Sequence, residues 1–266
     1  MNKKFFPILT VLGVLIIYLL VVSFNLLDIK IAGYALKKNK LKEYFSSIVT
    51  PEKKPLKKKH QTKKKLILQP TKITPDTSSQ RILIIGDSML EGLGPRLNDY
   101  CDENNHKLAL IVWYSSNSKW YGSCDTIPYF IARFKPTYII LAIGSGDVIA
   151  YNAIIERKPY IEKILKQVQG YKYIWVGPPN WRKDSGINDL IDNLVKDGTF
   201  FLSKDLTFER ESDGVHPTRK SASKWMDTIA SFIMNKSSNP IMLKIPKKKT
   251  QKRPTIYMLS PKPPVL

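Results

Sequence analysis

Ser88 and His216 are the two residues whose types and settings best fit covalent chemistry. Ser88 follows an aliphatic run and Gly86-Asp87, where the pattern predicts a turn from a strand into a helix. A serine hydroxyl becomes a nucleophile when a base takes its proton, and histidine is the usual base because its pKa lies near neutrality. Of the other histidines, His60 lies in a lysine-rich stretch and His106 in a polar turn. His216 is therefore the candidate base.

Asp213 precedes His216 by three residues, close enough to fold back onto Nδ1 of the imidazole and fix its tautomer. The N–H groups at the start of the helix after Ser88 point outward, and the helix dipole favours negative charge there. An oxyanion formed at Ser88 would therefore meet donors. Simpler interpretations stay open for each residue by itself: Ser88 as a helix N-cap, and Asp213 and His216 as loop residues before a helix.

Five short apolar runs alternate with four amphipathic helical patterns. The runs lie at 81–85, 108–113, 137–143, 171–176 and 199–202, and the helical patterns at 90–104, 151–169, 187–196 and 218–234. This alternation predicts an α/β sandwich with a parallel sheet of about five strands. In such sheets the active crevice lies beyond the carboxyl ends of the strands, which is where the predicted turn places Ser88.

Three short motifs follow one another at the ends of predicted elements. They are Gly86-Asp87-Ser88, Gly144-Ser145-Gly146-Asp147 and Asp213-Gly214-Val215-His216. In order and spacing they resemble the SGNH hydrolase family, also called GDSL-like lipases and esterases, over about residues 81–234. The resemblance implies a three-layer α/β/α fold, a triad of Ser88, Asp213 and His216, and no metal or organic cofactor.

One motif departs from the family pattern. The third block usually reads Gly-x-Asn-Asp, and its Asn side chain donates to the oxyanion, whereas here Gly146 occupies that position. Losing one such donor costs about 3–4 kcal/mol of transition-state stabilisation. The second block normally supplies a glycine N–H after the second strand, and Ser115 or Ser116 is expected to supply it here. Candidates to replace the missing side chain are Asn117, Asn152 and Asn180.

Trp181 is the aromatic residue best placed to contact a substrate, because Gly177-Pro178-Pro179-Asn180-Trp181 predicts a rigid loop at the active edge. Asn180 and Trp181 are therefore expected beside the substrate, together with Ser115 and Gly146. Arg182 and Lys183 suit either an anionic substrate or plain surface charge. The remaining aromatic residues near strand ends fit a core role better than sugar stacking: Trp113, Trp120, Tyr121 and Trp175.

The net charge of +21 belongs to the two ends of the chain. Residues 1–79 carry +12 and residues 237–266 carry +7, whereas residues 81–236 carry only +2. Residues 5–27 contain no charged residue and are long enough for one transmembrane helix. We therefore expect a cytoplasmic stub and anchor at 1–29, a Lys/Pro-rich flexible linker at 30–80, the hydrolase domain at 81–236 and a basic Pro-rich tail at 237–266.

A cleaved signal peptide is the alternative to an anchor, although the segment ends in bulky residues. Lysines flank the segment on both sides, and counting them favours a domain facing the cytoplasm. We expect the opposite, a single-pass protein with its domain on the periplasmic side, by analogy with the family. The Lys-rich arms are expected to act as solvated tethers or to bind anionic lipid or envelope polymer. Nucleic acid is not expected, because the basic residues lack interleaved aromatics.

Cys101 and Cys124 allow either one disulfide or two separate thiols. With only three histidines and no close cysteine pair, a structural zinc site is not expected.

The expected function is hydrolysis of an acylated cell-envelope glycan or another small ester, with Ser88 attacking the carbonyl, His216 taking its proton and Asp213 orienting the imidazole. Two alternatives stay open. One is an O-acyltransferase with the same triad, in which a sugar hydroxyl replaces water. The other is a non-catalytic envelope-binding protein on the same fold, which Gly146 favours and the intact triad disfavours.

Overall fold

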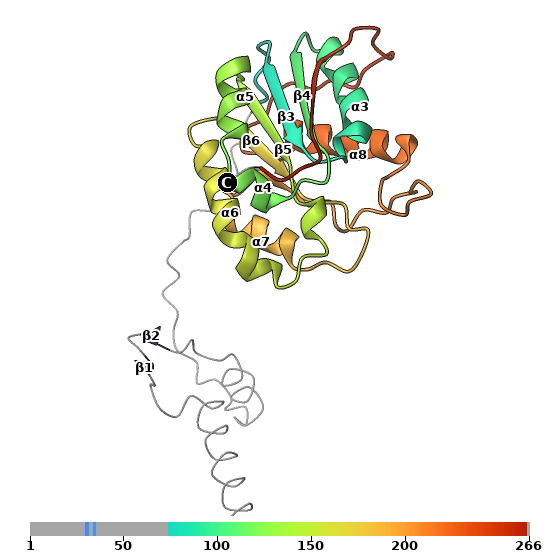
Figure 1. The fold of residues 1–266 in the computed structure, drawn as a ribbon. Coiled ribbons are helices and arrows are strands. Elements are labelled where there is room, and N and C mark those ends of the chain that lie inside the picture. The colour runs from blue at the N-terminus through green and yellow to red at the C-terminus, as the bar shows by residue number, and fades with distance from the viewer. Residues whose placement is uncertain (1–29, 32–33, 36–73, 265–266) are drawn as a thin grey trace, which may run out of the picture. The chain divides into compact units, whose positions relative to one another are not determined.

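The computed structural model describes residues 30–31, 34–35 and 74–264, which belong to two separate units (Figure 1). In the first unit, β1 (Lys30–Ile31) and β2 (Tyr34–Ala35) form an antiparallel pair. The second unit holds the α/β domain. No helix within the described ranges has the length and apolar character that a membrane span requires. The anchor predicted at 5–27 lies outside the described residues.

Six parallel strands form the sheet of the domain, in the order β7-β6-β5-β3-β4-β8. Their bounds are β3 (Arg81–Gly86), β4 (Lys107–Trp113), β5 (Tyr138–Ala142), β6 (Tyr173–Val176), β7 (Phe200–Phe201) and β8 (Thr255–Leu259). The inner strands are buried on both faces, which is why they read as continuous apolar runs. The predicted parallel α/β sheet is confirmed, with six strands where about five were expected.

Helices cover both faces of the sheet (Figure 1). On one face lie α3 (Leu90–Glu103) and α8 (Arg219–Asn235), and on the other α4 (Ser118–Gly122), α5 (Thr126–Phe134), α6 (Ala153–Gln167) and α7 (Ile187–Leu194). Alternate side chains of each strand enter different cores, so Ile82 and Ile84 pack with α3 and α8 whereas Leu83 and Ile85 pack with the other helices. The result is a three-layer α/β/α sandwich.

Neither α4 nor α5 was predicted. α4 has five residues and is begun by Asn117, whose side chain accepts a hydrogen bond from Trp120 N at 3.1 Å. α5 carries Pro128 in its first turn, where a missing N–H costs little, and ends at Lys135 in the left-handed conformation. Both helices are too short for a helical period to stand out in the sequence.

The folded unit extends beyond both expected boundaries, residues 81 and 236. Asp76 forms a parallel bridge with Ile241, and Gln80 is buried. Ile241 and Leu243 are 0% and 1% exposed, and β8 pairs with the whole of β4 from Ala109 onward. The expectation of a solvated tail at 237–266 therefore does not hold. The segment is rich in lysine, but it also contains apolar residues that are buried in the core.

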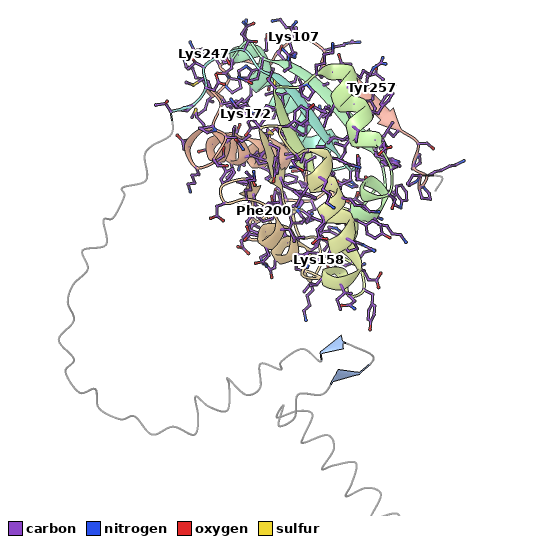
Figure 2. The ribbon with its side chains drawn as sticks, turned by 90° about the vertical axis from the view of Figure 1, so that its left-hand side faces the viewer. Lys107, Lys158, Lys172, Phe200, Lys247 and Tyr257 are labelled. Atoms are coloured by element: carbon purple, nitrogen blue, oxygen red, sulfur yellow. The ribbon has the colours of Figure 1, made fainter. Side chains whose placement is uncertain are left out.

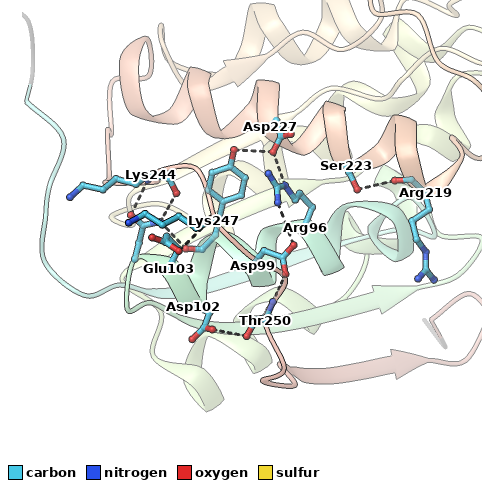
Figure 3. Close-up of polar contacts among 12 residues, drawn as sticks. Arg96, Asp99, Asp102, Glu103, Arg219, Ser223, Asp227, Lys244, Lys247 and Thr250 are labelled. Carbon is cyan, nitrogen blue, oxygen red and sulfur yellow. Dashed lines mark hydrogen bonds and ion pairs between the residues drawn. The ribbon is translucent and has the colours of Figure 1, made fainter.

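Acidic side chains of α3 meet the basic tail (Figure 3). Thr250 donates from its N to Asp99 at 2.9 Å and from its Oγ1 to Asp102 at 2.7 Å, and Lys252 Nζ lies 2.5 Å from Asp102. Exposed ion pairs of this kind contribute about 0–1 kcal/mol each. The buried apolar residues and the β8 ladder therefore provide most of the attachment.

The amino ends of the parallel strands lie at one end of the domain and their carboxyl ends at the other. Lys107 begins β4, Lys172 precedes β6, and both lie at the end of the domain where the tail passes with Lys247 (Figure 2). Lys158 of α6 lies at the other end (Figure 2). The carboxyl edge of the sheet, where the turns into α3 and α6 lie, is thus away from the crossing of the tail at Lys247.

We predict that Ile241→Ala lowers the free energy of unfolding by about 2–5 kcal/mol, because it opens a cavity at a fully buried position. Urea unfolding of the full chain measures this change. Ile245→Ala is the control from the same tail: Ile245 is 72% exposed, so its loss should change stability by no more than about 0.5 kcal/mol. Equal effects of the two variants would contradict a packed tail.

Candidate active site

Ser88 stands directly after β3 at the carboxyl edge of the sheet, half-buried, and just before α3. The chain reaches this turn through Gly86, where no other residue fits. A Cβ atom at Gly86 would lie 2.0 Å from the carbonyl oxygen of Ala142 in β5. The Gly86 carbonyl accepts a hydrogen bond from Tyr121 Oη at 2.9 Å. The position of the Ser88 backbone is thus held by close packing of β3 on β5 and by α4.

Asp87 joins the turn after β3 to the turn after β5. Its side chain is buried, with Oδ1 accepting from Met89 N at 3.1 Å and Oδ2 accepting from Ser145 N at 3.1 Å. Burial raises the pKa of this carboxyl, and the hydrogen bonds from Ser145 and Met89 act in the opposite direction. Asp87 therefore fixes Ser88 relative to the Gly144–Asp147 motif.

His216 is presented by a tight loop before α8. Glu211 N donates to His216 O at 2.8 Å and Thr218 N donates to Glu209 O at 2.8 Å, so the chain doubles back on itself. The turn is closed at Gly214, whose φ of 68° suits glycine. Thr218 then caps α8 through its side chain. Two hydrogen-bonded segments thus position the imidazole.

The three side chains expected to act together lie in one chain of contacts. His216 Nε2 lies 2.8 Å from Ser88 Oγ, and His216 Nδ1 lies 2.6 Å from Asp213 Oδ2. Asp213 Oδ1 also accepts from the backbone N–H groups of Val215 at 2.8 Å and His216 at 3.0 Å. The hydrogen bond from His216, followed by these amides, lowers the pKa of Asp213 to about 2.

The protonation pattern follows from these contacts. An ionised Asp213 can only accept, so the Nδ1 atom of His216 must carry the hydrogen between them. In a neutral imidazole Nε2 is then an acceptor, and it faces the Ser88 hydroxyl. Asp213 and His216 remain 46% and 35% exposed, so water reaches both side chains.

A small hollow of about 150 Å³ opens beside Ser88 and His216, and Glu91 and Arg219 form part of its wall. Tyr114 Oη donates a hydrogen bond to the Glu91 carboxylate, which raises the pKa of Tyr114 to about 12. Tyr114 is therefore a neutral donor that links the loop after β4 to the first turn of α3. Ser88 thus lies at the surface in a shallow depression.

Gly146 lies in the 3-10 turn Ser145–Asp147 after β5. A Cβ atom there would lie 2.8 Å from the carbonyl oxygen of Ser116 and 3.3 Å from Cβ of Asn117. The loop after β4 thus occupies the space that the family's Asn side chain would need. Asn117 lies against Gly146, and its Oδ1 accepts from Trp120 N. The Asn117 amide NH₂ group makes no hydrogen bond with any described residue.

Backbone donors near the site differ in their availability. Ser116 N donates to Trp113 O at 3.2 Å, so it is already used. Ser115 is exposed with a φ of 59°, and its N–H and that of Ser88 form no hydrogen bond within the part of the chain that the structure describes. Of the two serines expected to supply an N–H group, Ser115 is therefore the one with a donor to offer.

Asn180 and Trp181 follow β6 at the same edge of the sheet. Asn180 Oδ1 accepts from Asn188 Nδ2 at 3.1 Å. Half-buried Trp181 donates from Nε1 to Ser145 O at 3.3 Å, and the Arg182 guanidinium lies 5.2 Å from its ring. Trp181 therefore supports the turn after β5, whereas Asn180 is bound to α7. Asn152, the remaining amide candidate, is exposed at the start of α6.

Four supporting contacts, made by Asp147 and Arg210, were not predicted. Buried Asp147 accepts from Ser118 N at 2.7 Å and pairs with Arg157 Nε at 2.7 Å. Burial raises the pKa of Asp147, and these partners oppose the rise. Arg210 donates to the carbonyls of Val215 and, at 2.7 Å, Asn180. The motif contained Asp147, but no sequence signal pointed to Arg157 or Arg210, and Tyr121 was assigned only to the core.

The remaining candidates fall into the core or its margin. Trp113, Tyr121 and Trp175 are buried, and Trp120 packs half-buried on the same core. Cys101 and Cys124 are both free thiols, so the disulfide alternative does not hold.

Comparisons with known proteins give similarity in fold. No family model matches the chain, and no curated protein matches it. Among solved structures, a psychrotrophic esterase EstA from Pseudoalteromonas sp. is 18% identical with a TM-score of 0.42 and covers 57% of this chain and 96% of its own. TesA is 16% identical with a TM-score of 0.47, covering 58% and 98%. An acetyl esterase mutant with acetate ion is 11% identical with a TM-score of 0.41, covering 57% and 97%. At these values the function has to be inferred from the side chains of this chain.

We predict that replacing His216 with Ala moves the titration midpoint of the Asp213 carboxyl upward from about 2 toward its ordinary value of 3.8. The amides of Val215 and residue 216 keep it below that value. Because the folded pKa is depressed, the stability that this carboxylate contributes is present above about pH 4 and is lost as the pH falls toward 2. Carboxyl-carbon NMR measures the midpoint, and a midpoint that stays unchanged without the imidazole would contradict the assigned contact.

Proposed function

We propose that this protein is a serine-dependent ester hydrolase of the SGNH type that its motifs resemble. Ser88 is the nucleophile, His216 the general base and Asp213 the residue that orients the imidazole. The observation that carries the proposal is the continuous contact from Ser88 Oγ through His216 to the Asp213 carboxylate, at 2.8 and 2.6 Å. Such a contact gives a weak nucleophile a base of the right tautomer at neutral pH.

The reaction runs in two halves. Ser88 Oγ bonds to the ester carbonyl carbon while its proton passes to Nε2 of His216, and the tetrahedral intermediate then expels the alcohol, which takes that proton. Water attacks the resulting acyl-serine, giving a proton to His216, and the collapse of the second intermediate returns it to Ser88 and releases the acid. Asp213, ionised at neutral pH, stabilises the imidazolium in both halves.

The oxyanion of each intermediate needs hydrogen-bond donors. We assign this role to the backbone N–H groups of Ser88 and Ser115, which lack partners among the described residues. The third donor is the side-chain amide of Asn117. It lies against Gly146, at the position where the family pattern has its own asparagine, and its NH₂ group is uncommitted among the described residues. A residue from the loop after β4 thus replaces one from the loop after β5.

Exposure of the site favours hydrolysis over acyl transfer. Transfer requires that water be kept from the acyl-enzyme, whereas His216 and Asp213 are 35% and 46% exposed. The hydrogen-bonded triad also speaks against a purely binding role. The acylated glycan, the N-terminal anchor, the contacts of the Lys-rich arms and the periplasmic location remain predictions from the sequence.

Ser88→Ala should lower kcat for p-nitrophenyl acetate by about 10³-fold or more, because the acyl-enzyme cannot form. The melting temperature should stay close to that of the unaltered protein, since Ser88 is a half-buried surface turn residue. Ser231→Ala, an exposed serine on α8, is the control and should leave the rate unchanged. Full activity in the Ser88 variant would refute the proposed function.

Asn117→Asp tests the assigned donor. Aspartate can still accept the hydrogen bond from Trp120 N that caps α4, but it cannot donate to an oxyanion. We expect kcat to fall by about 10²–10³-fold with a melting temperature near that of the unaltered protein. Asn117→Ser also keeps a capping acceptor and adds no charge, and its hydroxyl ends one bond nearer the backbone than the amide nitrogen, so it should lose activity to a similar degree by falling short of the oxyanion. Unchanged kcat in both variants would exclude Asn117 as a donor.

A further inference from the structure

A second hollow, of about 590 Å³, runs along α3 between that helix and β8. Its volume falls in the range of pockets that bind small molecules. Lining residues extend along α3 from Leu90 to Asp99, a span of about 13 Å at 1.5 Å per residue. Glu91 and Arg219 line both this groove and the hollow that contains Ser88 and His216. The groove therefore adjoins the hollow that contains Ser88.

The wall that β8 contributes is apolar where a surface strand would be polar. Tyr257 and Leu259 pack against the core on the α5 side of the sheet. Ile256 and Met258 face the groove and are 47% and 64% exposed. A strand covered on one face normally alternates apolar and polar residues, whereas apolar residues on both faces are typical of a strand covered on both. Leu110 and Val112 of β4 continue this apolar floor.

Basic residues outnumber acidic ones in the lining of the groove, which has two carboxylates, Glu91 and Asp99, and five cations: Arg96, Arg219, Lys249, Lys252 and Arg253. Arg219 makes no side-chain hydrogen bond or ion pair with any residue in the described ranges, and in Figure 3 its guanidinium extends away from α8. The acidic residues that line the groove are both engaged: Glu91 accepts from Tyr114 Oη, and Asp99 accepts from Thr250 N and lies 3.5 Å from Arg96. The Arg219 guanidinium therefore has its donors available for an anionic group, in a groove whose lining holds more cations than carboxylates.

We propose that this groove binds the apolar acyl chain of the ester substrate, and that Arg219 binds an anionic group on the alcohol part. The proposal rests on the proposed hydrolase function and names its substrate class. The substrate is an amphiphilic ester with an acyl chain of medium length and an alcohol part that carries an anionic group. Apolar area removed from water along Ile256, Met258, Leu110 and Val112 favours the chain. The cation beside the serine sets the direction in which the substrate lies.

Hydrolysis of p-nitrophenyl octanoate and acetate tests the chain site. The full-length protein should prefer octanoate, and the double variant Ile256→Gln, Met258→Gln should lower the octanoate-to-acetate ratio of kcat/KM by about tenfold or more, with the acetate value unchanged. Ile245→Gln, an exposed isoleucine of the same tail outside the groove, should leave the ratio unchanged. A ratio unaffected by the double variant would overturn the proposal.

Binding of octyl phosphate to the Ser88→Ala protein, measured by calorimetry below the micelle concentration, tests the groove without catalysis. Arg219→Gln and the Ile256, Met258 double variant should each weaken binding by about tenfold, whereas Lys220→Gln should not, and inorganic phosphate should bind more weakly. If hydrolysis needs Ser88 but neither chain preference nor binding responds to these variants, the groove proposal fails alone. If Ser88→Ala keeps full activity, the hydrolase proposal fails, while octyl phosphate binding still decides whether the groove holds an amphiphile.

Discussion

The packing of α3 on α8 sets the distance between Ser88 and His216. Each helix begins just after one of these residues, so the spacing of the helices becomes the spacing of the side chains. The two helices meet at Gly92 and Ala222, where a Cβ atom on Gly92 would lie only 2.6 Å from Cβ of Ala222. A larger residue at either position would force the first turns apart. The hydrogen bond of 2.8 Å between Nε2 and Oγ depends on that close approach.

Further along the same helices, polar contacts keep them in register. Asp227 of α8 accepts from Arg96 Nε at 2.8 Å and from Tyr100 Oη at 2.9 Å, both from α3. Asp87 and Asp147 connect the segments at the carboxyl edge of the sheet. Each buried carboxylate accepts hydrogen bonds from backbone N–H groups of the neighbouring segments. A buried carboxylate is costly unless its oxygens are satisfied, so these turns are strongly determined. The side chains of His216 and Asp213 thus stand on a rigid frame although water reaches both of them.

The C-terminal strand links the stability of the domain to the shape of its surface. Without β8, β4 would be an edge strand with open hydrogen-bonding groups, and β8 covers it along five residue pairs. α3 lies over β3 and β4 and is not wide enough to cover β8 as well, so the α3 side of β8 stays open. β8 therefore both covers the edge of the sheet at β4 and leaves an apolar channel near Ser88. Asp99 and Asp102 add polar contacts to the tail that forms this channel.

Local patterns were sufficient for the inner strands and for the positions of Ser88 and His216 in the fold, because Ser88 follows a predicted strand and His216 shortly precedes a predicted helix. The tail shows the opposite case. The net charge of 237–266 describes the segment as a whole and does not identify which of its residues pack. Ile241, Leu243 and the strand Thr255–Leu259 pack against partners more than a hundred residues away in the sequence. Arg157 and Arg210 likewise carry no local signal, since what they bind is a carboxylate and two carbonyls brought close only by folding.

Gly146 is the clearest example of what the sequence alone could not predict. The sequence shows that a side chain is missing there and suggests three asparagines that could replace it. It does not show that the Ser116 carbonyl fills the space, because that contact joins the turns after two different strands. Once the carbonyl is there, an asparagine at residue 146 could not fit without moving the loop after β4. The glycine and the neighbouring Asn117 belong to one arrangement, because the contact that excludes a side chain at residue 146 also brings Asn117 against that turn.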